Sequence, residues 1–163
     1  MKMIAAVDAA WGIGYNNKLL VSIPEDMKFF RKMTEGKAVI CGRRTLQSFP
    51  QGKPLKNKLK NVVLTKDKTM AVPGAEIVHS VEEALEAVKD LPSDDVMIIG
   101  GEAIYRAFLP YCDTAYITRI DYKYAADAYF PNLDEDPEWE LVEEGEEQTY
   151  FDLVYNFTTY KRK

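Results

Sequence analysis

Asp26 is a carboxylate on a helix face that otherwise consists of apolar side chains. In KLLVSIPEDMKFFRKM, residues 18–33, apolar residues recur at helical spacing, at Ile23, Phe30 and Met33. Asp26 shares that face, and its burial among them would destabilise the fold unless a partner pairs with it. Burial also raises the pKa of a carboxyl group from about 3.9, so that it can bind a polar ligand edge and supply a proton near neutral pH. Acids are favoured in the first turn of any helix, so the pattern leaves a capping role and a functional role open.

A strand-to-helix turn after the first helix has the composition of an anion site. In VICGRRT, residues 39–45, an apolar run ends at Gly42 and is followed by Arg43, Arg44 and Thr45. Backbone N–H groups at a helix start and guanidinium groups together bind phosphate. Arginines at a helix start oppose the helix dipole, which favours an anionic ligand there. Two solvated surface arginines would give the same pattern.

A second turn of this kind is VMIIGGEAIY, residues 96–105. Gly100 and Gly101 let the backbone approach a ligand closely and leave N–H groups free at the next helix start. Open α/β sheets bind nucleotides at this position, although the G-x-G-x-x-G fingerprint is absent and a tight turn without a ligand is the alternative. Together, the two turns and the acid predict a dinucleotide beside a flat polar substrate.

The composition excludes several classes of protein. The chain has 163 residues, of which 47% are apolar and 29% charged, so we expect one globular domain, residues 1–163. A net charge of −5 and the lack of a long apolar segment predict no binding to nucleic acid or membrane. The only histidine, His79, is expected at a strand end, and Cys41 and Cys112 have no metal-ligand spacing. We therefore expect no metal site, reduced thiols and a cytoplasmic protein.

Strand-length apolar runs alternate with helical segments, which predicts an α/β fold with a central, mostly parallel twisted sheet and flanking helices. The expected strands are 3–7, 38–41, 61–65, 76–79 and 96–99, and the expected helices are 24–34, 43–49, 81–89 and 102–109. Capping boxes are expected at Ser22 with Glu25 and at Ser80 with Glu83, and Gly36 is expected to end the first helix. The later segments are expected to form an antiparallel C-terminal edge of the same sheet: 114–120, 139–143 and 152–161.

In this order the motifs resemble the dihydrofolate reductase family, of bacterial chromosomal type but divergent. The resemblance is collinear over nearly the whole chain and includes MIAAVDAAWGIGYNNKLL, IPEDMKFFRKMT, VICGRRTLQSF, NVVLT, VMIIGGEAIYRAFLP, YITRID, DAYFP and YNFTTYKRK. It implies an oxidoreductase that reduces dihydrofolate to tetrahydrofolate with NADPH as hydride donor, in support of one-carbon metabolism. It also implies a monomer that binds antifolate inhibitors such as trimethoprim and methotrexate.

The resemblance assigns roles by position. Asp26 would bind the pterin ring, and Thr118 would support Asp26 through its hydroxyl. The substrate-binding residues would be Ile4, Ala5, Met27, Phe30, Phe49, Lys58, Ile99 and Tyr105. The cofactor-binding residues would be Ala6, Ile13, Gly42, Arg43, Arg44, Thr45, Leu64, Thr65, Lys66, Gly100, Gly101, Glu102, Ala103, Ile104 and Tyr105.

The resemblance also predicts local geometry. Gly100 and Gly101 would be joined by a cis peptide bond. Residues 9–20 would form a mobile loop over the nicotinamide, and Asp127 would hold that loop shut.

Three positions differ from the family's usual pattern. Leu20 and Val21 replace the Pro-Trp that is usual in the family, and Lys58 replaces the arginine that binds the substrate's glutamate tail. Ala126 lies where glycine is common. Lysine cannot bind a carboxylate with two parallel bonds. These differences predict weaker binding of diaminopyrimidine inhibitors.

Two other functions fit parts of the pattern. The nearest is an NADPH-dependent reductase of the same fold that acts on a ribosylamino-pyrimidine in riboflavin synthesis, and the other is a nucleotide-binding domain without activity. Turnover of dihydrofolate distinguishes both from a dihydrofolate reductase.

Overall fold

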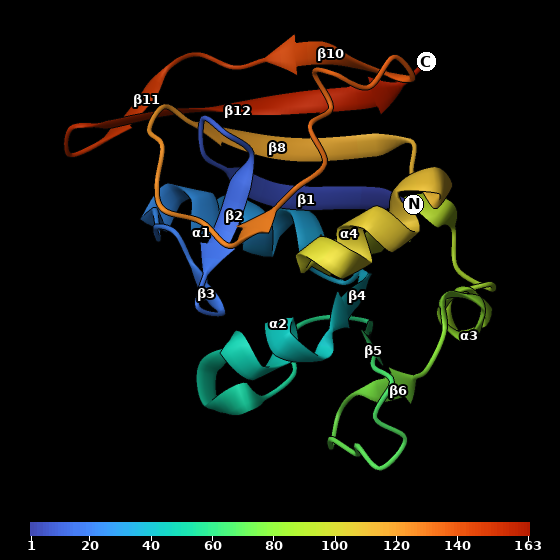
Figure 1. Ribbon diagram of the computed structural model, residues 1–163. Helices are drawn as coiled ribbons and strands as arrows, with labels where there is room; N and C mark the ends of the chain where they lie inside the picture. Colours follow the sequence, from blue (N-terminus) through green and yellow to red (C-terminus); the bar gives the residue numbers. More distant parts are fainter.

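A nine-stranded mixed sheet forms the centre of the molecule (Figure 1). The structure is a computed structural model that describes residues 1–163. The strands of this sheet are β1 (Lys2–Val7), β4 (Ala38–Gly42), β5 (Lys60–Leu64), β6 (Glu76–Val78), β7 (Val96–Gly100), β8 (Thr114–Ile120), β10 (Trp139–Glu144), β11 (Gln148–Tyr150) and β12 (Leu153–Arg162). They lie in the order β10-β12-β8-β1-β7-β4-β5-β6, and β11 also pairs with β12.

The six strands from β8 to β6 run parallel, whereas β12 is antiparallel to β8, β10 and β11. The predicted antiparallel direction is therefore wrong for residues 114–120 and correct for the two later strands. The reason is helix α4 (Glu102–Phe108), which lies between β7 and β8 and carries the chain back to the starting end of the sheet. A crossover of this kind joins parallel strands.

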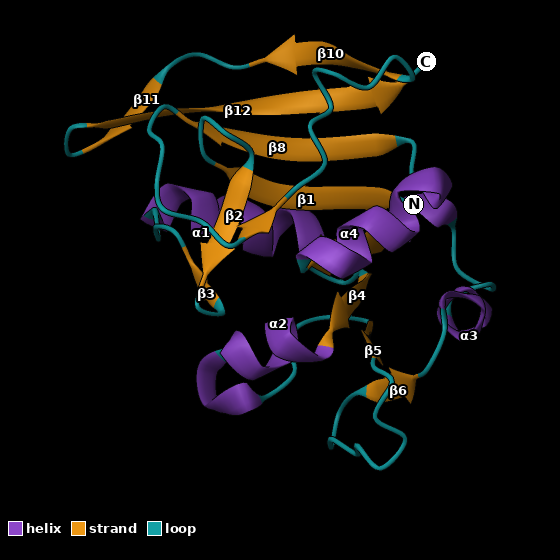
Figure 2. Ribbon diagram, viewed as in Figure 1, coloured by secondary structure: helices purple, strands orange, loops and turns teal.

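Helices cover both faces of the sheet (Figure 2). The others are α1 (Pro24–Thr34), α2 (Arg43–Ser48) and α3 (Val81–Ala87), and short 3-10 helices span Pro50–Gly52, Ser93–Asp95 and Leu109–Tyr111. In β4, Ala38 and Ile40 pack in one core cluster with α3 and α4, whereas Val39 and Cys41 pack in another with α1 and α2. Burial on both faces explains why the central strands are continuously apolar and confirms the predicted α/β class.

The helix ends agree only in part with the predicted capping. Ile23 is the N-cap of α1, its side chain is buried, and no side chain caps the helix, so the capping box at Ser22 and Glu25 is wrong. Glu25 instead pairs with Lys28, 3.2 Å away. At α3, Ser80 Oγ accepts the N–H of Glu83, as predicted, but the Glu83 carboxylate accepts from His79 rather than from Ser80.

A second, three-stranded sheet lies beside the carboxyl end of β1, from which the chain continues into the first strand of this sheet. It contains β2 (Gly12–Tyr15), β3 (Lys18–Leu19) and β9 (Ala128–Tyr129), in the order β3-β2-β9. Asn16 and Asn17 have φ values of 50° and 60° and form the hairpin turn between β2 and β3. The segment 9–20, expected as a loop, therefore contains a short hairpin that pairs with residues 128–129.

Gly36 follows α1 with φ of 71°, as expected for a glycine that ends a helix. The remaining predicted boundaries agree with the structure to within two residues. None of the helices combines the length and the apolar character needed to cross a lipid bilayer.

Candidate active site

The Asp26 carboxylate lies on the face of α1 that is turned toward the sheet. Thr118, a buried residue of β8, donates its hydroxyl to Asp26 Oδ1 at 2.6 Å. No other hydrogen bond or ion pair involves Asp26, so Oδ2 has no protein partner. Burial raises the pKa of Asp26, and the hydrogen bond from Thr118 opposes this increase only in part. Thr118 therefore fixes one oxygen of the Asp26 carboxylate, and the other oxygen can accept a hydrogen bond from a ligand.

Strand β1 places its side chains next to this carboxylate. Ala6 is the register partner of Thr118, and Ala6 packs with the cluster that contains Ile23 and Ile120. Ile4 packs in the cluster with α1 and α2, whereas Ala5 faces the opposite cluster, with α3 and α4. The side chains of Ile4 and Ala6 therefore lie on the Asp26 side of the sheet. The side chain of Ala5 lies on the opposite face.

Aromatic side chains extend the apolar wall away from Asp26. Phe30 and Phe49 pack against the cluster that contains Ile4 and Ile99. Met27 is half-buried in the same helix as Asp26. These side chains form the apolar surface expected of a pocket for a flat ring.

Lys58 lies past the end of this wall, beside the C-terminal part of α1. Its pKa is lowered chiefly by burial; Arg31 acts in the same direction and Glu35 opposes both. Arg31 is an exposed residue of α1 to which sequence analysis gave no role, although its position directly after Phe30 was a usable signal. Lys58 and Arg31 thus place two positive charges near the C-terminal part of α1.

The carboxyl ends of β4 and β7 meet as two glycine turns. A Cβ atom added to Gly101 would lie 3.4 Å from Thr45 Oγ1, and one added to Gly42 would lie 3.1 Å from Ile104 Cγ1. Gly100 and Gly101 are joined by a cis peptide bond, as predicted. The starts of α2 and α4 therefore approach each other closely at this edge, because neither turn carries a side chain.

Cationic side chains surround this edge. Arg43, Arg44 and Lys66 are exposed, and none of them forms an ion pair. The pKa of the exposed Asp67 is lowered mainly by hydrogen bonds from Thr69, with further contributions from Arg43 and His79, so the Arg43 guanidinium lies near this loop. Free cations beside glycine turns fit the phosphate groups of a dinucleotide.

Other predicted cofactor residues lie at the same edge. Thr65 is buried and follows the half-buried Leu64 at the end of β5, and its carbonyl oxygen lies 2.8 Å from His79 Nδ1. His79 follows β6, as expected for a strand-end histidine. In the first turn of α4, Ala103 is exposed, and Glu102 accepts the N–H of Tyr129 at 2.8 Å.

Tyr105 connects α4 to β1. It is 4% exposed and donates its hydroxyl to the Ile4 carbonyl oxygen at 2.7 Å. A Cβ atom on Gly100 would meet the Tyr105 ring at 3.3 Å. The ring therefore fixes β1 against the glycine turn.

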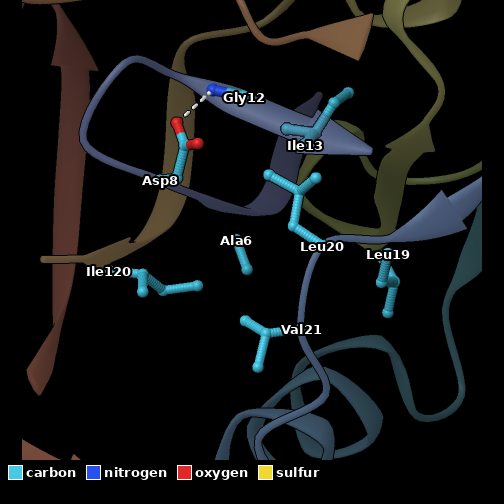
Figure 3. A pocket seen from close by; sticks show the side chains of 8 residues that line it. All are labelled: Ala6, Asp8, Gly12, Ile13, Leu19, Leu20, Val21 and Ile120. Atoms are coloured by element: carbon cyan, nitrogen blue, oxygen red, sulfur yellow. Dashed lines mark hydrogen bonds between the residues drawn. The ribbon is translucent and has the colours of Figure 1, made fainter. Parts of the chain in front are cut away.

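A small, mostly apolar cavity separates β1 from the segment 9–20 (Figure 3). Its lining residues are Ala6, Asp8, Gly12, Ile13, Leu19, Leu20, Val21 and Ile120. At the exposed side of the segment, Asp127 Oδ2 accepts the N–H of Asn16 at 3.0 Å, and Asp127 N donates to Gly14 O at 3.0 Å. Asp127 thus contacts the segment as the resemblance predicts.

A parallel sheet with two glycine turns at its carboxyl edge, free cations around them and a held carboxylate nearby defines a class: α/β enzymes that use a dinucleotide. No group of three or more His, Cys, Asp or Glu side chains is placed to hold a metal ion.

Comparison with known proteins identifies the family. The family model described as dihydrofolate reductase matches residues 1–162. Dihydrofolate reductase of Bacillus subtilis (strain 168) is 33% identical over 165 aligned residues, covering 100% of this chain and 95% of the relative. That of Staphylococcus haemolyticus is 35% identical over 163 aligned residues, covering 99% and 95%.

A solved structure shows the same fold. Dihydrofolate reductase from Enterococcus faecalis, complexed with NADP(H) and RAB-propyl, superposes with a TM-score of 0.85 at 30% identity, covering 99% of this chain and 95% of that one. The chain belongs to the dihydrofolate reductase family.

Proposed function

We propose that this protein reduces dihydrofolate to tetrahydrofolate, with NADPH as the hydride donor. The observation that carries the proposal is the 2.6 Å hydrogen bond that fixes one oxygen of the Asp26 carboxylate, in a chain that the family model matches from residue 1 to residue 162. The other oxygen is left for the edge of the pterin ring. The complex of the Enterococcus faecalis relative with NADP(H) supports the choice of cofactor.

In this proposal Asp26 acts on the substrate and not on the cofactor. Its free oxygen accepts N–H groups of the pterin edge, and the apolar surroundings strengthen these bonds because water competes less for the carboxylate. Since burial raises the pKa of Asp26, the carboxyl group exchanges its proton with the bound ring closer to neutral pH. Thr118 holds the carboxylate in one orientation throughout.

NADPH, when bound, supplies the hydride. Several residues of this chain would hold it. Arg43, Arg44 and Lys66 would pair with its phosphates, and the turns at Gly42 and Gly101, which carry no side chain, would let the protein backbone approach it closely. Ala6 and Ile13 flank the nicotinamide and keep water from the pterin ring.

The substrate tail leaves the apolar wall at Lys58. Lys58, with Arg31 beside it, would pair with the tail carboxylate as two separate ammonium and guanidinium contacts rather than as one bidentate clamp. Antifolates with a similar ring would occupy the same pocket against Asp26.

We also propose that residues 1–163 form one domain that acts as a monomer in the cytoplasm. All the residues assigned above lie in one chain, and both cysteines are free and buried, which suits a reducing compartment. A single cooperative unfolding transition and a monomer mass in solution are the expected measurements.

The experiment that tests the proposed activity follows NADPH absorbance with dihydrofolate and, separately, with a ribosylamino-pyrimidine. We expect NADPH to be oxidised in the assay with dihydrofolate and not in the assay with the pyrimidine. Oxidation with the pyrimidine alone would assign the protein to the other reductase class, and NADPH binding without oxidation would make it a nucleotide-binding domain.

A further inference from the structure

Asp8 is a buried carboxylate that the proposed mechanism does not use. It follows β1 and is 1% exposed. None of the ion pairs of the protein includes Asp8, so no cation balances its charge at short range. A buried carboxylate of this kind must be satisfied by hydrogen-bond donors.

Three backbone N–H groups from two distant segments supply these bonds. Asp8 Oδ1 accepts from Ala10 at 2.9 Å and from Gly12 at 2.7 Å, both in the segment 9–20. Asp8 Oδ2 accepts from Tyr124 at 3.0 Å, and Tyr124 lies 116 residues further along the chain. One side chain therefore joins the segment 9–20 to the segment 121–127.

The backbone reinforces the same junction. Asp8 N donates to Gly12 O, and Ala9 N donates to Tyr122 O, each at 3.0 Å. A Cβ atom on Gly12 would lie 3.0 Å from both carboxylate oxygens of Asp8 and 2.8 Å from the Ala126 Cβ. Gly12 is thus the residue that allows the carboxylate to lie between the two segments.

The junction also reaches the cavity beside β1. In Figure 3 the Asp8 side chain points toward Gly12, and Ile13 is the next residue on the same strand. Asp8, Ile13 and Ala6 all line that cavity. The position of Ile13 is therefore set by the bond between Asp8 and Gly12.

We propose that Asp8 is a positioning residue for hydride transfer: by binding Gly12 and Tyr124 at once, it fixes Ile13 and the segment 9–20 over the nicotinamide. The proposal rests on the proposed function, because that function places Ile13 and Ala6 beside the nicotinamide. Asp127 fastens the same segment at its exposed tip through Asn16. Asp8 provides the buried attachment at the base of the segment.

The test compares NADPH with 2′-phospho-ADP-ribose, a fragment that lacks the nicotinamide, as ligands of the Asp8→Asn variant. Asparagine offers one acceptor oxygen where the carboxylate offers two, so at least one N–H loses its partner. We expect NADPH affinity and turnover to fall about tenfold or more, while fragment affinity stays within about twofold. Equal losses for NADPH and the fragment would mean a general structural defect and would overturn the proposal, as would unchanged NADPH affinity.

Two further variants complete the design. Asp136→Asn is the matched control, because Asp136 also accepts a loop N–H, from Glu138 at 2.9 Å, in the loop before β10, and it makes no hydrogen bond to the segment 9–20; both affinities should be unchanged. Gly12→Ala keeps the carboxylate but forces it away, and should reproduce the pattern of Asp8→Asn. A Gly12→Ala variant with normal NADPH affinity would contradict the proposal.

Amide hydrogen exchange in the unmodified protein covers the case in which Asp8→Asn does not fold. The N–H groups of Ala10, Gly12 and Tyr124 should be protected and should gain protection together when NADPH binds. An unprotected Tyr124 N–H would refute the junction. These binding and exchange measurements need no turnover, so a failure of the proposed reductase activity is distinguishable from a failure of the role of Asp8.

Discussion

Thr118→Val is the most informative perturbation of the carboxylate, because it removes one hydroxyl and keeps the shape of the side chain. The hydroxyl donates to Asp26 Oδ1 at 2.6 Å, and Thr118 is 2% exposed, so water does not readily replace it. A hydrogen bond to a charged group contributes about 1.5–3 kcal/mol, and the lower end applies here since Asp26 is only half-buried. We therefore expect kcat/KM for dihydrofolate to fall roughly tenfold near neutral pH.

The same variant should also change the pH dependence. The hydroxyl of Thr118 lowers the pKa of Asp26 against the larger effect of burial. Without it the pKa rises further, so the limb of the pH–rate profile that reports loss of this proton moves to higher pH. The assay is kcat/KM for dihydrofolate measured across the pH range for both proteins.

Thr114→Val is the matched control for this experiment. Thr114 lies on the same strand, is also buried, and donates its hydroxyl to a carboxylate, Asp113 Oδ1, at 2.9 Å. It is expected to leave the pH–rate profile unchanged. A Thr118→Val profile that superposes on that of the unmodified protein would refute the role of the hydroxyl.

Three other perturbations test separate parts of the account. Arg43→Ala and Arg44→Ala should each weaken NADPH by about tenfold and NADH much less, since an exposed charge-assisted contact to the 2′-phosphate is lost. Asp26→Asn should raise the thermal unfolding midpoint at about pH 7 but not at about pH 3, because burial raises the pKa of Asp26. The neutral acid contributes its full stability below the unfolded pKa of about 3.9, and this stability is lost as pH rises through the folded pKa. Trimethoprim should inhibit the unmodified protein more weakly than the Bacillus subtilis relative, and Val21→Trp should strengthen inhibition by about tenfold through aromatic contact.

A control variant tests the arginine prediction, and a single outcome would contradict each of the other two. Lys89→Ala, a remote exposed cation paired with Glu86, should change neither nucleotide affinity; equal losses of NADPH and NADH in the arginine variants would show that they do not bind the 2′-phosphate. A lower unfolding midpoint for Asp26→Asn at neutral pH would mean that the carboxylate is not strained by its surroundings. A trimethoprim curve that coincides with that of the relative would remove Val21 from inhibitor selectivity.

Periodicity was sufficient to place the central strands and the four helices. Continuous apolar runs such as Val96–Gly100 are buried on both faces, and their short length, β-branched residues and bounding turns identify them as strands. The short strands β2, β3 and β9 escaped prediction because two to four residues carry no measurable alternation. The pairing of β2 with β9 is moreover a tertiary contact between residues more than a hundred positions apart, such as Gly12 and Tyr129.

In the candidate site, too, local pattern predicted some residues, and contacts between distant residues stayed hidden. The helical stripe identified Asp26, but pattern alone could not identify Thr118 as its partner, because 92 residues separate them and only the packing of α1 against β8 brings them together. The role of Asp8 was also hidden. An acid directly after the buried strand β1 was visible in MIAAVD, yet its partners are backbone N–H groups, which a sequence does not mark.

The capping box at Ser22 and Glu25 failed for a physical reason. The pattern supplies the right residue types, but burying Ile23 with Ile120 and Tyr155 stabilises the chain more than a surface capping bond. The burial of Ile23 fixes where the chain enters α1. The same entry places Asp26 in the first turn, opposite Thr118.

Turnover of Asp26→Asn as a function of pH, measured together with NADPH affinity, tests most directly whether a single half-buried carboxylate holds and protonates the pterin ring. We expect NADPH affinity within about twofold of normal, turnover at about pH 7 reduced by about a hundredfold or more, and partial recovery in acid, where the substrate is already protonated. Normal turnover at about pH 7, or a loss of turnover explained by an equal loss of NADPH affinity, would contradict the account.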